Sequence, residues 1–182
     1  MIRLLLAALV SLASPSPHAT EPLALVARGD IQVAFTPGDD AGALVVNAIN
    51  RAKREILVQA YGFTHKDIAA ALVAAKKRGV EVSLVADRQQ AEKLETSLVD
   101  WLARQGVPVW IDGDHSAAHN KVMVLDAGTP QPVLITGSFN FTHAAQYRNA
   151  ENLLVLRDNP LLAQAYAANW RRHRAHSLKL SR

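Results

Sequence analysis

Cysteine is absent from this chain of 182 residues, so neither disulfide bonds nor thiolate chemistry contributes to it. Aromatic residues make up only 5% of the sequence, and no aromatic-rich module for stacking on nucleic-acid bases is visible. There is also no convincing internal repeat or low-complexity stretch. What remains, 49% hydrophobic and 20% charged residues, is a composition typical of an ordinary globular domain.

No segment is long and apolar enough to span a bilayer. The apolar run Leu4–Val10 follows a single arginine, is shorter than a membrane-spanning helix requires, and is followed by small residues and prolines. This pattern is typical of a secretory signal peptide over residues 1–20, cleaved after Ala13 or Ala19; an uncleaved anchor is the alternative. We therefore expect residues 21–182 to form one domain that is periplasmic or secreted.

The net charge is +4 and the isoelectric point is about 9.6, which favours an anionic partner. Basic residues gather in the last twelve positions, 171–182, where there is no acidic residue. We expect Arg171, Arg172 and Arg174 to contact the phosphate backbone of a nucleic acid, with affinity that falls as salt rises. The alternative is a solvated helix end with no ligand.

Strands and helices alternate in the first half of the chain, which predicts an α/β fold with a largely parallel sheet between layers of helices. In the second half, strands follow one another closely and should pair antiparallel, so the whole sheet is expected to be mixed. Asp39 and Asp40 suit the start of the first helix, and Pro160 suits the first position of the last. We expect strands at 31–37, 55–63, 80–87, 107–111, 121–125, 133–136 and 152–157, and helices at 41–52, 64–79, 90–105 and from Pro160 through Trp170.

Two of these strands, 121–125 and 133–136, flank a turn-rich tip at 127–132 and so predict a hairpin. If Asp126 pairs with Val133, Lys121 lies opposite Ser138 and His119 lies opposite Asn140. Directly opposed residues share a face of the sheet, and so do His119 and Lys121, because strand side chains alternate. The hairpin therefore gathers four polar side chains at the end remote from its turn.

An ammonium, an imidazole, a hydroxyl and an amide with no carboxylate among them suit a tetrahedral oxyanion such as phosphate. Lys121 supplies the positive charge, Ser138 and Asn140 donate hydrogen bonds, and His119 can attack phosphorus or transfer a proton. The alternative is that these side chains only make the end of a surface strand polar. Because Lys121 would repel a cation and no cluster of carboxylates or histidines is present in the patch, we expect no catalytic metal and no cofactor.

The pattern His119-x-Lys121-x4-Asp126, followed by Gly137-Ser138-x-Asn140, resembles the HKD motif of the phospholipase D superfamily. Most of residues 31–175 resembles the small bacterial nuclease branch that carries a single such motif. The family usually has six residues between the aspartate and the Gly-Ser pair, and this chain has ten. Four extra residues at a hairpin tip leave the faces of the outer pairs unchanged, because four is an even number.

The resemblance implies a phospholipase D-like α/β/α sandwich and hydrolysis of phosphodiesters in two steps. One histidine attacks phosphorus to form a phosphohistidine, and a second protonates the leaving oxygen and then activates water. This chain has one motif, so the resemblance implies a homodimer that brings two copies of His119 to one phosphate. The remaining histidines that we considered as the second group lack motif partners, and we interpret them as surface or structural: His65, His115, His143, His173 and His176.

Two acidic residues belong to the same constellation. Asp126 is part of the motif, but the hairpin places it at the turn end, so we expect it to bond backbone groups and not to take part in the chemistry. Glu151 occupies a position at which, by resemblance, a glutamate contacts the catalytic histidine and fixes its tautomer. The alternative for Glu151 is an exposed charge at the start of a strand.

Nucleic acid is the substrate that charge and resemblance favour, which predicts a non-specific endonuclease on DNA or RNA. Because no module for reading bases is visible, cleavage should depend on the phosphate backbone. The first alternative is a phospholipase D that hydrolyses phospholipid head groups. The second is a non-catalytic module that binds nucleic acid or a membrane surface.

Overall fold

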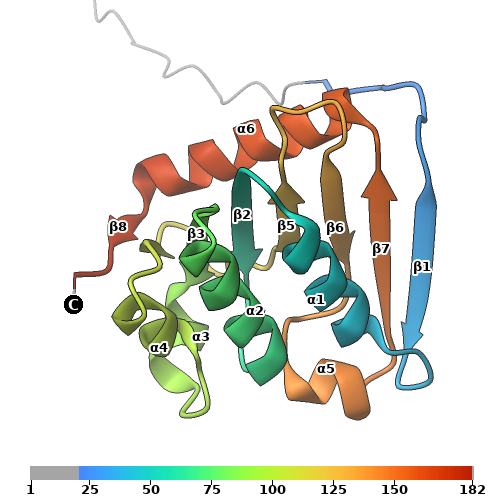
Figure 1. Cartoon of the computed structure of the whole chain (residues 1–182). Helices are drawn as coiled ribbons and strands as arrows, with labels where there is room; N and C mark the ends of the chain where they lie inside the picture. Colours follow the sequence, from blue (N-terminus) through green and yellow to red (C-terminus); the bar gives the residue numbers. More distant parts are fainter. Residues whose placement is uncertain (1–20, 182) are drawn as a thin grey trace, which may run out of the picture.

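The protein forms one eight-stranded sheet covered by helices. The computed structural model describes residues 21–181, and the expected signal peptide at residues 1–20 lies outside this part of the chain. The strand order is β1-β7-β6-β5-β2-β3-β4-β8 (Figure 1). The strands are β1 (Ile31–Thr36), β2 (Glu55–Ala60), β3 (Glu81–Asp87), β4 (Val109–Asp112), β5 (Lys121–Leu125), β6 (Val133–Gly137), β7 (Glu151–Arg157) and β8 (Leu178–Lys179). The helices are α1 (Ala41–Arg51), α2 (Lys66–Lys77), α3 (Arg88–Lys93), α4 (Val99–Arg104), α5 (His143–Tyr147) and α6 (Pro160–His176).

The expected α/β fold with a mixed sheet is confirmed, but the sheet is less parallel than the alternation predicted. Among the strands of residues 21–181, only β2 with β3 and β3 with β4 pair in parallel. β1 pairs antiparallel with β7, and β5 pairs antiparallel with both β2 and β6. The reason is that β1 lies at the far edge, beside the last long strand, so the antiparallel half of the chain separates it from β2.

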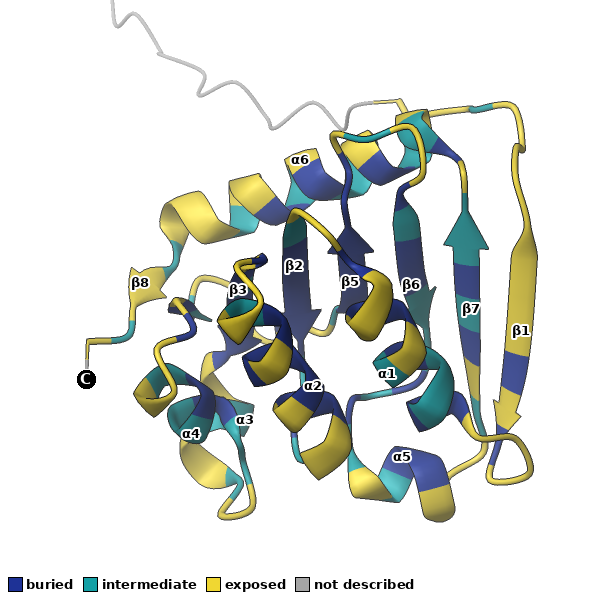
Figure 2. Ribbon diagram, in the orientation of Figure 1, coloured by how far each residue is buried: buried dark blue, intermediate teal, exposed yellow. Residues whose placement is uncertain are grey.

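Each face of the sheet buries its own apolar cluster. Helices α1, α2 and α4 pack on one face, where alternate residues of β2 such as Ile56 and Val58 join Met123 of β5 in the larger cluster. Helix α6 covers the other face, against Leu57 and Val124. Buried positions accordingly run through the central strands, while much of β1 is exposed (Figure 2). This is the sandwich that the sequence predicted.

Local signals explain where most helices begin. The side chain of Asp40 accepts a hydrogen bond from the backbone of Ala43 at the start of α1, and Pro160 occupies the first turn of α6, as expected. Helix α2 ends in Lys76 and Lys77 before Gly79, whose φ of 93° suits glycine.

Other local expectations were wrong. The helix expected at 64–79 is shorter, since α2 begins at Lys66 after His65, whose side chain makes no capping hydrogen bond. The single helix expected at 90–105 is two short helices, because Leu94 adopts an extended conformation that ends α3. The short elements α5 and β8 were not anticipated, since neither is long enough to show a clear apolar period.

Candidate active site

The candidate site lies at the edge of the sheet where β2 ends and β5 begins. The loop 113–120 leads from β4 to β5 and carries His119 immediately before the strand. The backbone N–H of Tyr61 donates to the carbonyl of Asn120, 2.9 Å away, which ties this loop to the end of β2. Lys121 then pairs with Ala60 in the sheet. The position of His119 is therefore set by backbone pairing as well as by its side chain.

His119 and Lys121 are in direct contact, as their shared face predicted. The Nζ atom of Lys121 lies 2.9 Å from Nδ1 of His119 and donates to the His119 carbonyl at 2.8 Å. An ammonium group has no acceptor, so in this arrangement Nδ1 of the imidazole accepts the hydrogen bond. The proton of the neutral ring is then on Nε2. His119 itself is exposed and accessible to a substrate, whereas Lys121 is buried.

The surroundings of Lys121 keep its charge close to the imidazole. Its Nζ lies 4.9 Å from the centre of the Tyr61 ring, and that ring is also 4.3 Å from the ring of His119. Burial lowers the pKa of Lys121, and the nearby carboxylate of Glu151 opposes this shift. Tyr61 was not among the predicted site residues. Its signal in the sequence was an aromatic side chain directly after a buried strand.

The predicted hairpin is present, but its register was wrong by one residue. Val133 pairs with Leu125 and not with Asp126. The reason is that Asp126 leaves the strand with a φ of 55° and donates its backbone N–H to the carbonyl of Glu55 on β2. Continued outward, this register would place Lys121 opposite Gly137 and not opposite Ser138.

At the far end of β6 the pairing with β7 becomes irregular. The backbone N–H groups of Ser138 and Phe139 both donate to the carbonyl of Asn152, at 3.0 and 3.1 Å. Two residues of one strand thus oppose one residue of its partner, and Gly137, with a φ of 143°, precedes them. Phe139 and Phe141, on either side of Asn140, belong to the same apolar cluster as Met123 and Leu125 of β5, so the predicted opposed pairs Lys121–Ser138 and His119–Asn140 are not formed.

Ser138 and Asn140 line the same end of the sheet without bonding to the histidine–lysine pair. The hydroxyl of Ser138 accepts the backbone N–H of Asn152 at 3.0 Å. The Oδ1 atom of Asn140 is buried with no hydrogen-bond partner, and a Cβ built on Gly62 would lie 4.0 Å from it. Gly62 follows Tyr61, whose ring contacts His119. The segment 61–62 therefore links the two sides of the predicted patch.

The two acidic residues lie at opposite ends of the hairpin strands. The carboxylate of Asp126 accepts the backbone N–H groups of Lys53, Arg54 and Glu55 at 2.9, 2.7 and 3.1 Å, which are the backbone contacts expected of it. Glu151 begins β7 and accepts a hydrogen bond from the side chain of Asn149 at 3.0 Å. Within residues 21–181 no hydrogen bond joins Glu151 to His119, so the predicted contact is not formed in this chain.

The three arginines predicted to bind a phosphate backbone lie on the last turns of α6. All three are exposed, and Arg174 stacks at 5.4 and 5.5 Å over the rings of Trp110 and Trp170. The guanidinium of Arg172 donates to the side chain of Asn169. No hydrogen bond or ion pair in the described part of the chain connects Arg171, Arg172 or Arg174 to the candidate site.

Comparison with known proteins also relates this chain to phosphodiesterases. Residues 45–173 match the family described as cardiolipin synthase, PLD-like domain. A phospholipase D from Rickettsia felis is 37% identical over 166 residues, which cover 91% of this chain and 80% of that protein. The human mitochondrial cardiolipin hydrolase is 30% identical over 122 residues, which cover 67% of this chain and 46% of that protein.

Solved structures agree with these relatives. The phospholipase D family member Nuc from Salmonella typhimurium superposes with a TM-score of 0.79 and 35% identity, over 85% of this chain and all of that one. NucT from Helicobacter pylori shares the fold at a TM-score of 0.74 and 20% identity, over 84% of this chain and all of that one. With its family match, its relatives and its sandwich fold, the chain belongs to the phospholipase D superfamily of phosphodiesterases.

Proposed function

We propose that the protein hydrolyses phosphodiester bonds of nucleic acids through a phosphohistidine formed on His119. The observation that carries this proposal is the contact between the exposed imidazole of His119 and the buried ammonium of Lys121, at the end of the sheet that also holds Ser138 and Asn140. Lys121 supplies a fixed positive charge for the phosphoryl oxygens, and Ser138 and Asn140 supply hydrogen-bond donors at the same end.

The proposed chemistry needs two histidines in different protonation states. In the first step a lone pair on Nε2 of one His119 bonds to phosphorus, and the ester oxygen on the opposite side leaves with a proton from the second histidine. In the second step the second histidine takes a proton from water, and the hydroxide displaces the imidazole. The observed arrangement, with Nδ1 accepting from Lys121, puts the proton of a neutral ring on Nε2, and the histidine that acts as the acid needs a proton on both nitrogens, so that Lys121 has to leave Nδ1 there too.

The attacking histidine needs its proton on Nδ1, so the hydrogen bond from Lys121 has to be replaced by an acceptor. Glu151 is the candidate, since its carboxylate already acts electrostatically on Lys121. A carboxylate on Nδ1–H would fix that tautomer and would leave Lys121 free to contact the phosphate.

We infer that the second histidine comes from a second copy of the chain. Ile31, Val33 and Phe35 of edge strand β1 are large apolar side chains that are exposed on one face of the sheet. Phe35 pairs with Asn152, so this apolar strip ends beside Glu151 and the candidate site. A partner covering the strip would remove apolar surface from water and would bring its own site close.

The distribution of charge supports nucleic acid as the substrate. The chain is basic overall, three exposed arginines follow one another on α6, and the similarity to Nuc spans the whole of that chain. Phospholipid is the second candidate, because relatives named phospholipase D are 37% identical to this chain. No helix within residues 21–181 is long and apolar enough to cross a membrane.

Parallel assays on supercoiled plasmid DNA, single-stranded RNA and phosphatidylcholine vesicles separate these candidates. The wild type should nick DNA or cleave RNA with little dependence on sequence, and His119→Ala should be inactive on every substrate. Choline release from vesicles without cleavage of nucleic acid would replace the proposed substrate. No turnover of any of the three would favour a binding module.

The shared site can be tested with mixed dimers of wild-type and His119→Ala chains. If each phosphate requires two copies of His119, a dimer with one altered chain should lose nearly all activity. A mixed dimer that keeps near-full activity per intact site would contradict the sharing.

We also propose that the chain is exported, with its signal peptide cleaved after Ala13 or Ala19. Mass spectrometry of the protein recovered from the periplasm or medium should give an amino terminus at residue 14 or 20. An intact amino terminus in the cytoplasmic fraction would contradict export.

A further inference from the structure

Four side chains converge at the last turn of α6, and the proposed chemistry uses none of them. Asp112 ends β4 and is completely buried. His115 follows in the loop 113–120, and His173 and His176 lie three residues apart on α6, where such residues share a face. We define these four residues as the Asp-His cluster. Nothing in the sequence connects them, because Asp112 and His173 lie 61 positions apart.

All three imidazoles direct a nitrogen at the same carboxylate. Nδ1 of His173 is 2.9 Å from Oδ2 of Asp112, Nε2 of His176 is 3.2 Å from the same oxygen, and Nδ1 of His115 is 3.1 Å from Oδ1. The ring centres of the histidines are 4.9, 5.2 and 5.3 Å apart, so the rings form an almost equilateral triangle with the carboxylate at its apex. Three imidazoles and one carboxylate are a number and kind of ligands that a tetrahedral metal site can use.

The spacing also fits. A tetrahedral ion with bonds of about 2.0–2.1 Å holds its ligand atoms about 3.3–3.4 Å apart. The ligand atoms of the Asp-His cluster all lie within 4.8 Å of one another, and the three nitrogen–oxygen distances are within a few tenths of an ångström of the tetrahedral value. The side chains of His115 and His176 are 47% and 31% exposed and can rotate to close the remaining gap.

Without a metal, each neutral imidazole can donate one N–H to the carboxylate of Asp112. A divalent ion replaces the protons between the nitrogens and the carboxylate, and imidazole with carboxylate is a ligand set that suits Zn²⁺ among the available metals.

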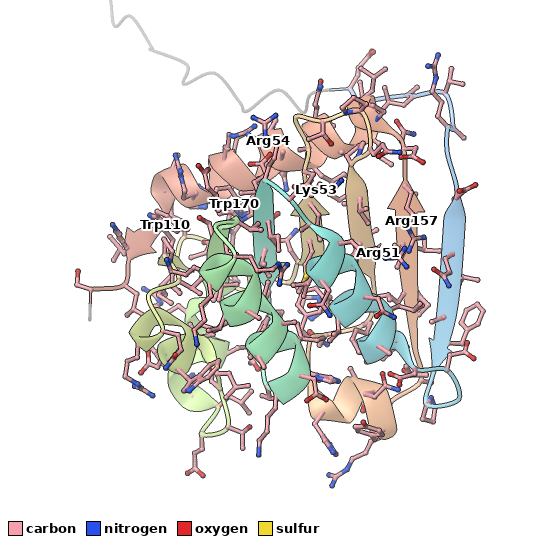
Figure 3. The ribbon with its side chains drawn as sticks, in the orientation of Figure 1. Arg51, Lys53, Arg54, Trp110, Arg157 and Trp170 are labelled. Carbon is pink, nitrogen blue, oxygen red and sulfur yellow. The ribbon has the colours of Figure 1, made fainter. Side chains whose placement is uncertain are left out.

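We propose that Asp112, His115, His173 and His176 form a structural Zn²⁺ site. Four protein ligands leave no open position for water or substrate, which distinguishes this site from a catalytic one. The ion would fasten three segments together: the end of β4, the loop that carries His119, and the last turn of α6. Packing already brings these segments together, since Trp170 of α6 and Trp110 of β4 are 6.0 Å apart at their ring centres (Figure 3).

The proposed site stabilises the loop without controlling the position of His119. The other end of the loop is held by hydrogen bonds that need no metal: Ala118 donates its backbone N–H to the carboxylate of Asp87, and Asn120 accepts from Tyr61. Loss of the ion should therefore lower stability and loosen residues 113–117, while His119 remains next to Lys121 at moderate temperature.

The experiment uses the protein without a polyhistidine tag, stripped of metal with EDTA and desalted at pH 7.5. Zn²⁺ is titrated against a chromophoric chelator, and Co²⁺ is added separately to record its visible spectrum. The wild type should bind one Zn²⁺ per chain, give the intense visible bands of tetrahedral Co²⁺, and unfold at a higher temperature with Zn²⁺ than without. Amide exchange of residues 113–117 should slow on addition of Zn²⁺.

Three variants make the test specific. His173→Gln and His176→Gln should each bind Zn²⁺ at least about tenfold more weakly and lose the tetrahedral spectrum. The matched control is His143→Gln, which removes an exposed histidine outside the Asp-His cluster and should bind like the wild type. If His173→Gln does not fold, His115→Gln, which alters an exposed loop position, takes its place.

The inference is wrong if the wild type shows no saturable binding, or if the cluster variants bind Zn²⁺ as tightly as His143→Gln does. It is also wrong if Co²⁺ gives only the weak bands of octahedral coordination. None of these results bears on the proposed function, because His119→Ala should abolish hydrolysis and still bind one Zn²⁺.

Discussion

Replacing Asp126 by alanine separates the two roles that a conspicuous motif residue can have. Its carboxylate accepts three backbone N–H groups at the start of β2 and lies at the turn end of the hairpin, remote from His119. The structure therefore predicts that Asp126→Ala lowers the free energy of unfolding and leaves the rate of the chemical steps nearly unchanged.

The size of the effect follows from those contacts. A hydrogen bond to a charged group contributes about 1.5–3 kcal/mol net, and three are lost. Asp126 is buried but Lys53 and Arg54 are exposed, so water reaches the freed N–H groups and reduces the total to about 2–4 kcal/mol. For a domain of this size that corresponds to a fall in Tm of about 5–12 °C.

Urea and thermal unfolding measure the stability, and hydrolysis of bis(4-nitrophenyl) phosphate at 15 °C measures the chemistry. Glu92→Ala is the matched control, since Glu92 is an exposed carboxylate on α3, and it should change neither quantity. A loss of kcat of about a hundredfold or more, equal to about 2.7 kcal/mol of activation free energy, with an unchanged Tm, would show that Asp126 takes part in the chemistry.

Three further predictions follow from other parts of the molecule. In Gly137→Ala the new Cβ would lie 2.3 Å from the carbonyl oxygen of Asn152, at a φ of 143°. The free energy of unfolding should therefore fall by about 2–4 kcal/mol and activity by at least about tenfold. The control Gly128→Ala, whose Cβ would meet nothing within 4 Å, should match the wild type. Burial lowers the pKa of His65, although Asp67 and Asp40 oppose this shift, so the unfolded state binds more protons below about pH 6.5. The free energy of unfolding should therefore fall as the pH is lowered, by at most about 1.4 kcal/mol per pH unit. If urea melts of His65→Asn lose stability with falling pH as steeply as the wild type, this explanation is contradicted. Turnover at 15 °C should continue in excess EDTA, and complete loss restored by Mg²⁺ would contradict the proposed mechanism.

The fold was predictable because its strands and helices carry strong local signals. The buried run of β2, the cap of α1 by Asp40 and the first-turn Pro160 of α6 are all visible in the sequence. What could not be predicted was the partner of β1, since an alternating strand such as Ile31–Thr36 pairs equally well in either direction. That choice depends on which edge of the sheet remains uncovered, which is a property of the whole chain.

The candidate site was predicted in composition and only in part in geometry. The contact of His119 with Lys121 follows from strand alternation alone and needs no register. Placing Ser138 and Asn140 opposite Lys121 and His119 required the register of the hairpin. The predicted register was wrong by one residue, because Asp126 leaves the strand and bonds to the backbone of β2. The backbone is also irregular at Ser138, and in the sequence only the preceding Gly137 indicated this.

The Asp-His cluster was not predictable at all. Its four residues come from a strand end, a loop and the last turn of a distant helix, and no pair of them has a ligand spacing specific enough to stand out. Each histidine taken alone is more often a surface residue than a ligand. Their relation depends on how α6 crosses the sheet, which the packing of Trp170 against β4 determines.

The identity of the nucleophile is tested most directly by trapping the covalent intermediate. The protein is mixed with bis(4-nitrophenyl) phosphate, quenched in base within its first turnovers, digested, and analysed by mass spectrometry. A nitrophenyl phosphoryl group attached to the peptide that contains His119 in the wild type, and absent from His119→Ala, is the result we predict. Turnover without such an adduct, or an adduct on another residue, would contradict the proposal that the imidazole of His119 attacks phosphorus.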